Sequence, residues 1–351
     1  MKNFKYKTIM KVKSFIKVLN LAKYVAMAAL LVGTTAACSD DDDDNNGSGS
    51  SSFETPKYEA EAAKYVINDQ STSPYKSIEL TASGNFIIQP SDYVNNAMQK
   101  APAKGKKTMV QRLTGMLTAH NAMPQTRYEV NTMMIAYGKY TKTGENQYNL
   151  DGFGTLTIKK DADGTTRSII LTRTGQEPAE YTAHEQKTNP DSEMTSKLCR
   201  TWNIESYRYS MKANGRTLFD FTGNTIKELA AKLKAWAEKN DPEFDESDWD
   251  DEDVLGEYNP KDVIFTKTGT YMVLYSNDWL AVSTWAWENE KNGILRYSWN
   301  PDNLYDDDYS GEVKVEFNNN KLHLIEFDID KDEDDGTIYE ENITYIMHEV
   351  K

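Results

Sequence analysis

Two stretches of the sequence share one hairpin pattern: Thr81-Ala-Ser-Gly84-Asn-Phe86-Ile-Ile88 and Thr266-Lys-Thr-Gly269-Thr-Tyr271-Met-Val273. In both, a glycine precedes a run of aromatic and β-branched residues, which favour strands. Two more pairs match in the same order, Tyr65-Val-Ile67 with Trp202-Asn-Ile204 and residues 181–187 with 345–351. The last pair shares Tyr, His, Glu and Lys at the same spacing. Three matches in one order predict an internal repeat.

Strand-like segments fill most of both halves, with β-branched or aromatic residues between Gly, Asn and Asp turns. In the first half they are expected at 78–81, 85–89, 132–141, 154–160, 168–173 and 179–184. In the second half they are expected at 263–266, 270–275, 280–287, 294–299, 312–317, 321–328 and 338–349. This regular spacing predicts a mainly β protein of two tandem antiparallel meander domains, each a barrel or a sandwich, with short helical insertions.

The domain boundary is expected at the turn-rich segment Thr188-Asn-Pro-Asp-Ser192. The first domain then covers residues 56–188, with an insertion over 91–126 that is expected to be helical or mobile. The second domain covers residues 189–351 and carries a predicted helix over 225–239.

The predicted helix begins with a capping-box pattern, Thr225-Ile-Lys-Glu228. Apolar residues then recur at helical spacing, namely Ile226, Leu229, Ala230, Leu233 and Ala237. We expect this helix to pack one face on the sheet.

The composition is that of a globular, acidic protein. Its 351 residues are 38% hydrophobic and 27% charged, with a net charge of −15. The acidity argues against nucleic acid binding, which needs Lys and Arg to neutralise phosphates. Cys38 and Cys199 are the only cysteines, which excludes a disulfide framework and a cysteine-based zinc site.

The two halves carry opposite net charges. Residues 56–190 carry 16 bases and 13 acids (net +3), and residues 191–351 carry 17 bases and 36 acids (net −19). These opposite charges favour docking of the domains.

The N-terminal 37 residues have the layout of a secretory signal peptide. They contain seven lysines and no acid, then an apolar stretch at 24–33, and then the small residues Thr34-Thr-Ala-Ala37 before Cys38. The apolar stretch is shorter than the ~20 residues that a spanning helix needs. A signal-anchor helix is the alternative.

Residues Thr35-Ala-Ala37-Cys38 resemble a lipobox, with Thr35 where leucine is usual. An acidic run at 40–44 and a Gly/Ser-rich stretch follow, so residues 38–55 are expected to be a flexible tether. A cysteine followed by an acidic run resembles the export signal of surface lipoproteins in Bacteroidota-type bacteria. The resemblance implies acylation (palmitate) of Cys38, a lipid bilayer as partner, and an outer-membrane anchor with the folded part at the cell surface.

Each half also resembles a lipocalin-like (calycin-like) domain of such lipoproteins. The second half carries Leu198-Cys-Arg-Thr-Trp202-Asn-Ile204, where the lipocalin signature is Gly-x-Trp and Arg200 stands at the glycine position. The first half has Tyr65 at the aromatic position. The resemblance implies small antiparallel barrels, which can be hollow, and no fixed activity.

All seven tryptophans lie in the second half of the chain. Strand parity places five side chains of one expected strand on one face, namely Trp279, Ala281, Ser283, Trp285 and Trp287. The next strand presents Leu295, Tyr297 and Trp299 on one face, and one register places Trp285 opposite Tyr297. These rings are candidates for an aromatic platform for a sugar or apolar ligand, formed by Trp279, Trp285, Trp287, Tyr297 and Trp299. The alternative is that they form the barrel core.

Two acidic segments are candidates for weak Ca²⁺ binding. Asp330, Asp332, Asp334 and Glu341 have the spacing of an EF-hand loop, but Asp335 stands at its glycine position and strands are expected on both sides. An acidic hairpin turn is the alternative. Residues 241–257 contain ten acids and no base, which is typical of a solvated loop, with binding of Ca²⁺ or a basic partner as the alternative.

The sequence contains no Gly-x-Ser-x-Gly, His-Glu-x-x-His or phosphate-loop motif, so no catalytic residue is named. We therefore expect a non-enzymatic surface lipoprotein without a cofactor. Its second domain is expected to bind a small ligand (a glycan or an apolar molecule) or a partner protein. A structural or adhesive subunit that assembles by strand pairing is the second hypothesis. A glycoside hydrolase is the third, because carboxylates are abundant but their separation is not readable from sequence.

Overall fold

The computed structural model describes most of both predicted domains. The described residues are 53–91, 123–124, 135–189, 191–240, 260–276, 279–300, 303–306, 310–331 and 336–350. The predicted signal peptide, Cys38, the tether up to residue 52 and the acidic run at 241–257 lie outside them. Most of the expected insertion over 91–126 also lies outside them.

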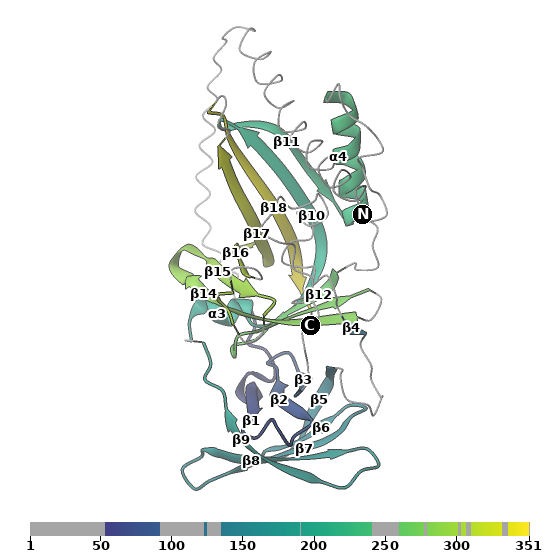
Figure 1. Cartoon of the computed structure of the whole chain (residues 1–351), viewed down its shortest axis with the longest axis vertical. Coiled ribbons are helices and arrows are strands. Elements are labelled where there is room, and N and C mark those ends of the chain that lie inside the picture. The colour runs from purple at the N-terminus through teal and green to yellow at the C-terminus, as the bar shows by residue number, and fades with distance from the viewer. Residues whose placement is uncertain are drawn as a thin grey trace, which may run out of the picture.

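The first domain is a closed antiparallel barrel of eight described strands (Figure 1). In spatial order they are β1 (Ala63–Ile67), β2 (Tyr75–Leu80), β3 (Asn85–Pro90), β5 (Ala136–Gly144), β6 (Gln147–Leu150), β7 (Gly154–Lys160), β8 (Thr166–Arg173) and β9 (Ala179–Glu185). Pairing of β1 with β9 closes the barrel. A buried cluster that includes Ile78, Phe86, Tyr140 and Leu156 fills its interior.

The second domain is another closed antiparallel barrel of eight described strands. They are β10 (Thr201–Ala213), β12 (Pro260–Phe265), β13 (Thr270–Tyr275), β14 (Trp279–Asn289), β15 (Ile294–Ser298), β16 (Ser310–Asn318), β17 (Lys321–Lys331) and β18 (Ile338–Glu349). Pairing of β10 with β18 closes it. The predicted fold class, mainly β with two tandem antiparallel barrels, is therefore confirmed.

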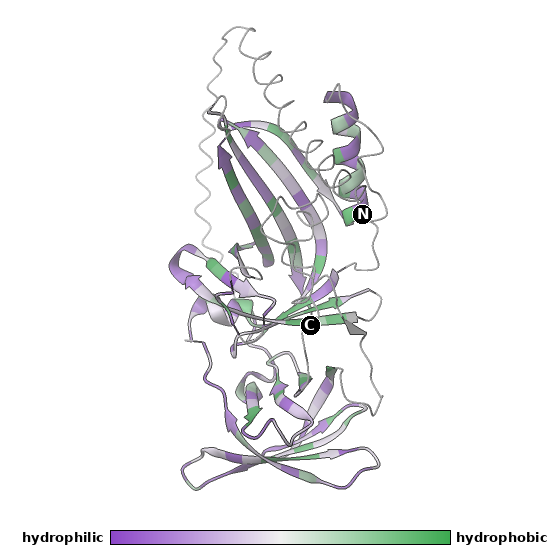
Figure 2. Cartoon of the chain, viewed as in Figure 1, coloured by the Kyte–Doolittle hydropathy of each residue, from purple (hydrophilic) through white to green (hydrophobic). Residues whose placement is uncertain are grey.

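Further described elements are attached to the second barrel, among them a 3-10 helix at Glu290–Asn292 between β14 and β15. Helix α3 (Glu193–Leu198) precedes β10, and β4 (Met123–Pro124) pairs with β14. Strand β11 (Arg216–Gly223) pairs with β10, and helix α4 (Ile226–Asn240) follows it. Hydrophobic and hydrophilic residues alternate along the long strands of this barrel, as expected for a sheet with one face in a core (Figure 2).

The two barrels repeat the same turn between corresponding strands. The amide of Gly84 donates to the carbonyl of Thr81 at 3.0 Å, and the amide of Gly269 donates to that of Thr266 at 3.1 Å. Both glycines have left-handed backbones, with φ of +77° and +83°, which residues with a Cβ adopt only with strain. The same residue type is therefore required at the same place in both halves.

An aromatic residue lies over each of these turns. In the first barrel, the hydroxyl of Tyr140 donates to the Thr81 carbonyl at 3.0 Å. In the second, the indole Nε1 of Trp285 donates to the Thr266 carbonyl at 3.1 Å. Tyr140 and Trp285 thus occupy corresponding positions of the two barrels.

The closing strands also pair in the same register. Tyr65 lies opposite Glu185 across β1 and β9, and Trp202 lies opposite Glu349 across β10 and β18. Tyr65 and Trp202, from the matched stretches 65–67 and 202–204, therefore lie at corresponding positions beside the strands that end each half.

The barrels pack against each other through the outer faces of their strands. An apolar cluster joins Ile87 and Ile135 of the first barrel to Ile264, Met272, Leu280 and Val282 of the second. The ion pair between Glu59 and Lys267 crosses this junction. Its acid comes from the half with net positive charge and its base from the half with net negative charge, the reverse of the polarity that the net charges would give.

Each repeated turn takes part in the junction. Ser83 of the first turn accepts a hydrogen bond from the amide of Thr201 at 3.0 Å. The hydroxyls of Thr268 and Thr270, from the second turn, donate to the buried carboxylate of Glu79, the latter at 2.6 Å. Because a buried carboxylate requires hydrogen-bond donors, these contacts fix the position of the second turn on β2.

Candidate functional site

The aromatic residues predicted on β14 and β15 lie together in the second barrel. Trp285 is directly opposite Tyr297, which is the predicted register. The Trp285 side chain is 1% exposed and makes edge-on contacts with Phe265 and Trp287, at centroid distances of 5.8 and 5.7 Å. Trp285 is therefore part of the barrel core.

The other predicted rings surround this core. Tyr297 and Trp299 pack on Tyr271, at centroid distances of 6.4 and 5.6 Å, and both are buried. The indole of Trp287 is half-buried and donates to the hydroxyl of Thr195 in α3 at 2.9 Å. The backbone of Trp279 lies at the start of β14, and its side chain is outside the described residues. A ligand-binding role for these rings stays a prediction.

Carboxylates reach the interior of this barrel from its long strands. Glu326 accepts a hydrogen bond from the hydroxyl of Tyr345 at 2.7 Å. Burial raises the pKa of Tyr271, Tyr297 and Tyr345, and the nearby Glu326 carboxylate adds to this effect. These phenols are therefore neutral hydrogen-bonding groups.

The candidate Ca²⁺ residues are divided between two strands and a segment outside the described part. Asp330 is exposed near the end of β17. Glu341 is 9% exposed on β18 and accepts a hydrogen bond from the hydroxyl of Tyr209. Asp332 and Asp334 lie outside the described residues. Within the described part of the chain, no three His, Cys, Asp or Glu side chains are grouped as metal ligands, and Ca²⁺ binding at this loop stays untested.

Helix α4 is held beside β11 by its first turn and its apolar face. The hydroxyl of Thr225 accepts from the amide of Glu228 at 3.1 Å, and the Glu228 carboxylate accepts from the amide of Asn224 at 2.9 Å. These bonds satisfy donors that a helix start leaves without intrahelical partners. The buried residues of α4 are Ile226, Leu229, Ala230, Leu233 and Ala237, the five at the helical spacing noted in the sequence.

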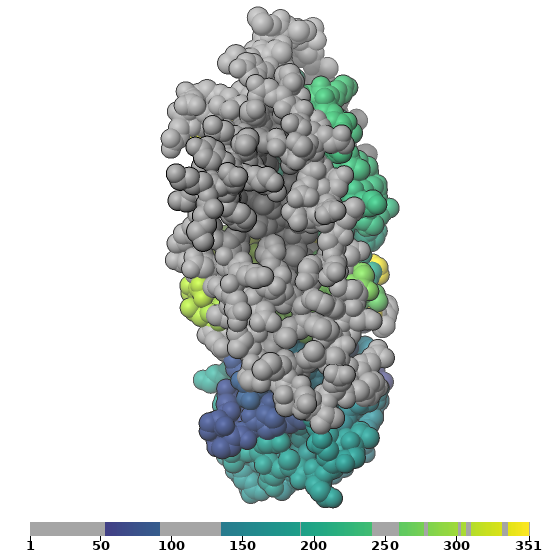
Figure 3. All heavy atoms as spheres, turned by 45° about the vertical axis from the view of Figure 1, so that its right-hand side comes forward, coloured from purple at the N-terminus to yellow at the C-terminus, as the bar shows by residue number. Residues whose placement is uncertain are grey.

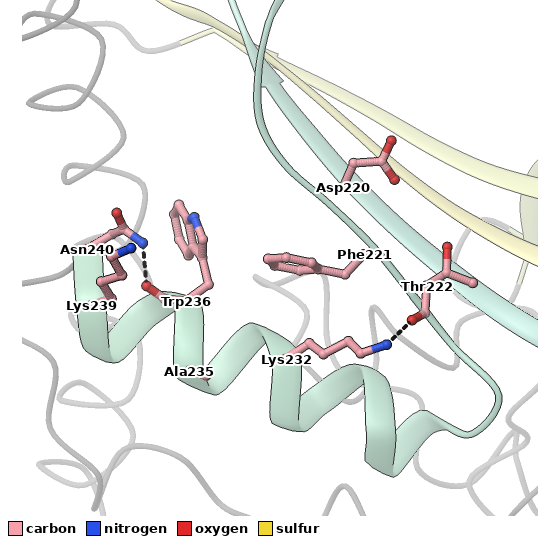
Figure 4. Close-up of a pocket in the computed structure, with 8 residues that line it drawn as sticks. All are labelled: Asp220, Phe221, Thr222, Lys232, Ala235, Trp236, Lys239 and Asn240. Carbon is pink, nitrogen blue, oxygen red and sulfur yellow. Dashed lines mark hydrogen bonds between the residues drawn. The ribbon is translucent and has the colours of Figure 1, made fainter.

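An open groove of about 720 Å³ lies between α4 and β11 (Figure 4). Its lining residues are Asp220, Phe221 and Thr222 from β11, and Lys232, Ala235, Trp236, Lys239 and Asn240 from α4. Figure 4 shows the rings of Phe221 and Trp236 facing the space between the helix and the strand. The α4 residues lie at the surface in Figure 3, far from the first barrel. The groove therefore presents aromatic rings on an outer part of the molecule.

The two groove rings are supported from the core. Phe219 stacks on Phe221 at a centroid distance of 5.5 Å and makes an edge-on contact with Trp236 at 5.0 Å. Phe219 is itself buried, and it contacts Tyr209 in the barrel. This packing fixes the orientation of the half-buried Phe221 and Trp236 without covering them.

Polar groups form the rim of the groove. The guanidinium of Arg208 binds Asp220, with an Nε to Oδ1 distance of 2.7 Å, and lowers the pKa of that carboxyl. Lys232 is paired with Glu228 at 2.8 Å, which lowers the pKa of Glu228. Lys239 has no ion-pair partner among the described residues. Among the lining residues that the structure describes, Asp220 is the only carboxylate.

No family model matches this chain, and no curated protein is similar to it. In the described part of the chain, no helix has the length and apolar character needed to cross a membrane.

The groove was not predicted from the sequence. Trp236 lies beside the apolar stripe of α4, and the spacing that indicated the helix assigned that stripe to packing. The available signal was a tryptophan on an expected surface helix, adjacent to Lys232 and Lys239 at helical spacing. Phe221 gave no such signal because no strand was expected over the residues that form β11.

Proposed function

We propose that this protein is a non-enzymatic, surface-anchored lipoprotein that binds a small ligand in the groove between β11 and α4. The observation that carries the proposal is the pair of half-buried rings, Phe221 and Trp236, in an open groove with a polar rim. Ligand sites combine apolar and aromatic walls with a few placed polar groups. A saccharide ring fits this combination, because its apolar face stacks on an aromatic ring while its hydroxyls reach the rim.

A glycan array followed by calorimetric titration of the best ligand tests the proposal. Trp236→Ala should weaken binding by about tenfold or more, equal to about 1.4 kcal/mol of binding free energy. Tyr305→Ala is the matched control, because Tyr305 is an exposed aromatic residue outside the groove. Equal affinities of the Trp236→Ala and wild-type proteins would refute the groove as the binding site.

The anchor is a separate part of the proposal, in which the Cys38 thiol carries the acyl chains. Cys199, the other cysteine, is buried at the end of α3, and burial raises the pKa of its thiol. Labelling of cells with a palmitate analogue should therefore mark the wild-type and Cys199→Ala proteins but not Cys38→Ala. Cys38→Ala should also be released from membranes in folded form. Continued membrane attachment of Cys38→Ala would contradict the anchor.

Assembly by strand pairing is a second candidate function, and one observation favours it. Strand β17 pairs with β16 only as far as Ile325, while its residues up to Lys331 continue along β18. Phe327 and Ile329 on this continuation are 45% and 68% exposed. Exposed apolar edge strands add strands from other chains. Sedimentation of the full chain should show assemblies that Ile329→Lys dissolves, and a monomer at all concentrations would reject this candidate.

A further inference from the structure

The two rings of the groove between β11 and α4 are held at a fixed angle by Phe219. The ring of Phe221 lies parallel to that of Phe219, with 4° between their planes, whereas the ring of Trp236 is inclined to Phe219 by 62°. Phe221 and Trp236 are therefore strongly inclined to each other, as Figure 4 shows. Phe219 is 6% exposed and contacts Tyr209 in the barrel at a centroid distance of 5.1 Å, so a ligand cannot change this angle without repacking the core.

The two rings are also spaced for neighbouring units of one ligand. Each lies beside the same Phe219 ring, with centroid distances of 5.5 Å for Phe221 and 5.0 Å for Trp236. One ring comes from β11 and the other from α4, on the two sides of the groove. The groove volume of about 720 Å³ lies within the roughly 300–1,000 Å³ of sites for drug-sized ligands, so the groove has room for more than one sugar unit.

The polar side chains of β11 lie on the other face of the strand. Strand parity places the Asp220 and Thr222 side chains opposite to Phe221. On that face the guanidinium of Arg208 binds both oxygens of the Asp220 carboxylate. Figure 4 shows the Asp220 carboxylate directed away from α4. The β11 side of the groove therefore presents the Phe221 ring and main-chain atoms to a ligand.

Helix α4 adds a mixed set of hydrogen-bonding groups around Trp236. The ammonium of Lys232 is already bound by the Glu228 carboxylate at 2.8 Å. The Asn240 amide donates to the Trp236 carbonyl at 2.7 Å, which leaves the carboxamide oxygen as an acceptor. Lys239, three residues after Trp236, supplies an ammonium donor. Sugar hydroxyls both donate and accept hydrogen bonds, so they match this set better than a ligand that only accepts or only donates.

We propose, on the basis of the function proposed above, that the ligand is a single glycan chain whose successive sugar rings turn relative to one another. Each of two neighbouring sugars stacks on one aromatic ring, because only parallel faces bring many atoms into contact at once. In a flat ribbon such as cellulose, successive sugar faces are coplanar, so two strongly inclined aromatic rings cannot both stack on it. In a coiled chain such as amylose or laminarin, successive faces are inclined, as Phe221 and Trp236 are.

Calorimetric titration of the full chain with four hexasaccharides tests this geometry. Maltohexaose and laminarihexaose are coiled chains, and cellohexaose and chitohexaose are flat chains of the same length. We expect a coiled chain to bind about tenfold or more tightly than either flat chain. Equal or tighter binding of a flat chain, lost in Trp236→Ala, would overturn the coiled-chain proposal and leave the groove as a glycan site. Binding of none of the four would also overturn it, whereas the glycan array tests the groove itself.

Two ring variants show whether both rings contact one chain. Phe221→Leu and Trp236→Leu keep an apolar side chain against Phe219 but remove a stacking face. Each should weaken binding of the coiled hexasaccharide by about threefold or more, and should reduce the gain in affinity from glucose to the hexasaccharide. Phe327→Leu, the same change at a 45% exposed ring on β17, is the control and should bind like the wild type. Wild-type affinity that does not rise with chain length, or full binding by Phe221→Leu, would show that one ring alone contacts the sugar and would overturn the proposal.

Discussion

The two barrels have the same framework but differ in what extends from it. Each has a left-handed glycine turn, an aromatic residue that donates to the turn, and an aromatic residue beside the closing strand. However, β1 has 5 residues, whereas its counterpart β10 has 13. The extra length of β10 runs beyond the closed part of the second barrel, along β18.

This difference in strand length creates the candidate site. Strand β12 pairs with β10 only as far as Asn203, which leaves the same edge of β10 available further on. Strand β11 pairs there, from Tyr207 to Ala213, and α4 packs against it. The closed barrels are therefore the structural unit that both halves share, and the extension of one strand supplies the groove.

The largest expected effect is on the shared aromatic position. Trp285→Ala and Tyr140→Ala should each lower the free energy of unfolding by about 3–5 kcal/mol, because each leaves a cavity in a closed barrel. Denaturant unfolding followed by fluorescence and circular dichroism measures this. Trp236→Ala is the control. It should lower the free energy of unfolding much less, because Trp236 lies half-buried at the groove. A small loss of unfolding free energy in Tyr140→Ala would show that Tyr140 and Trp285 do not have corresponding structural roles in the two barrels.

The shared turn glycines give the next effect, and they distinguish the two halves. Gly269→Ala and Gly84→Ala should each cost about 1–2 kcal/mol for the left-handed backbone. An added Cβ at Gly269 lies 3.0 Å from the Trp285 carbonyl oxygen, which is strand backbone, whereas at Gly84 it lies 2.8 Å from the Tyr58 ring, a side chain that shifts more readily than a paired strand. Gly269→Ala should therefore be the more destabilising change in thermal unfolding.

A third glycine provides the control for this comparison. Gly215 has φ of +77° and has open space around its added Cβ, so Gly215→Ala reports the backbone cost alone. If Gly269→Ala and Gly215→Ala lowered the unfolding temperature equally, the contact between the added Cβ and the Trp285 carbonyl oxygen would make no contribution to the loss of stability.

The cap of α4 tests the extension without touching either closed barrel. Thr225→Ala should lower stability by about 1 kcal/mol, because the hydroxyl that accepts from Glu228 is lost. Hydrogen exchange should show faster opening of α4 and unchanged protection in the first barrel. Thr225→Ser keeps the acceptor and should behave like the wild type. Faster exchange in both barrels would show that α4 is part of the common framework.

The smallest effect is the pH dependence contributed by His323 on β17. Burial lowers the pKa of His323, so the unfolded chain binds this proton more readily than the folded protein. Stability should therefore fall as the pH falls below about 6.5 and level off below the folded pKa. His323→Gln should remove the part of the stability decline that His323 contributes. The difference in free energy of unfolding between the variant and the wild type at about pH 8 serves as the baseline. Identical pH profiles would exclude the effect.

Sequence patterns were sufficient to predict much of the local structure. Glycine turns, alternating apolar residues and the spacing of Ile226, Leu229 and Leu233 depend on short-range geometry, so most strands and helix α4 follow from them. Strands β6 and β11 were not among the expected strands. The register of Trp285 with Tyr297 also followed, because strand parity and a short turn leave few alternatives.

Which face of a strand points inward was decided by tertiary structure alone. Parity separates Ala281 and Trp285 from Leu280 and Val282, yet both faces of β14 are apolar and buried. One faces the barrel core and the other faces the first barrel, because docking covers the outer face as completely as closure covers the inner one. The groove lies between two consecutive elements, β11 and α4, and its position was decided by the pairing of β11 with the extended part of β10.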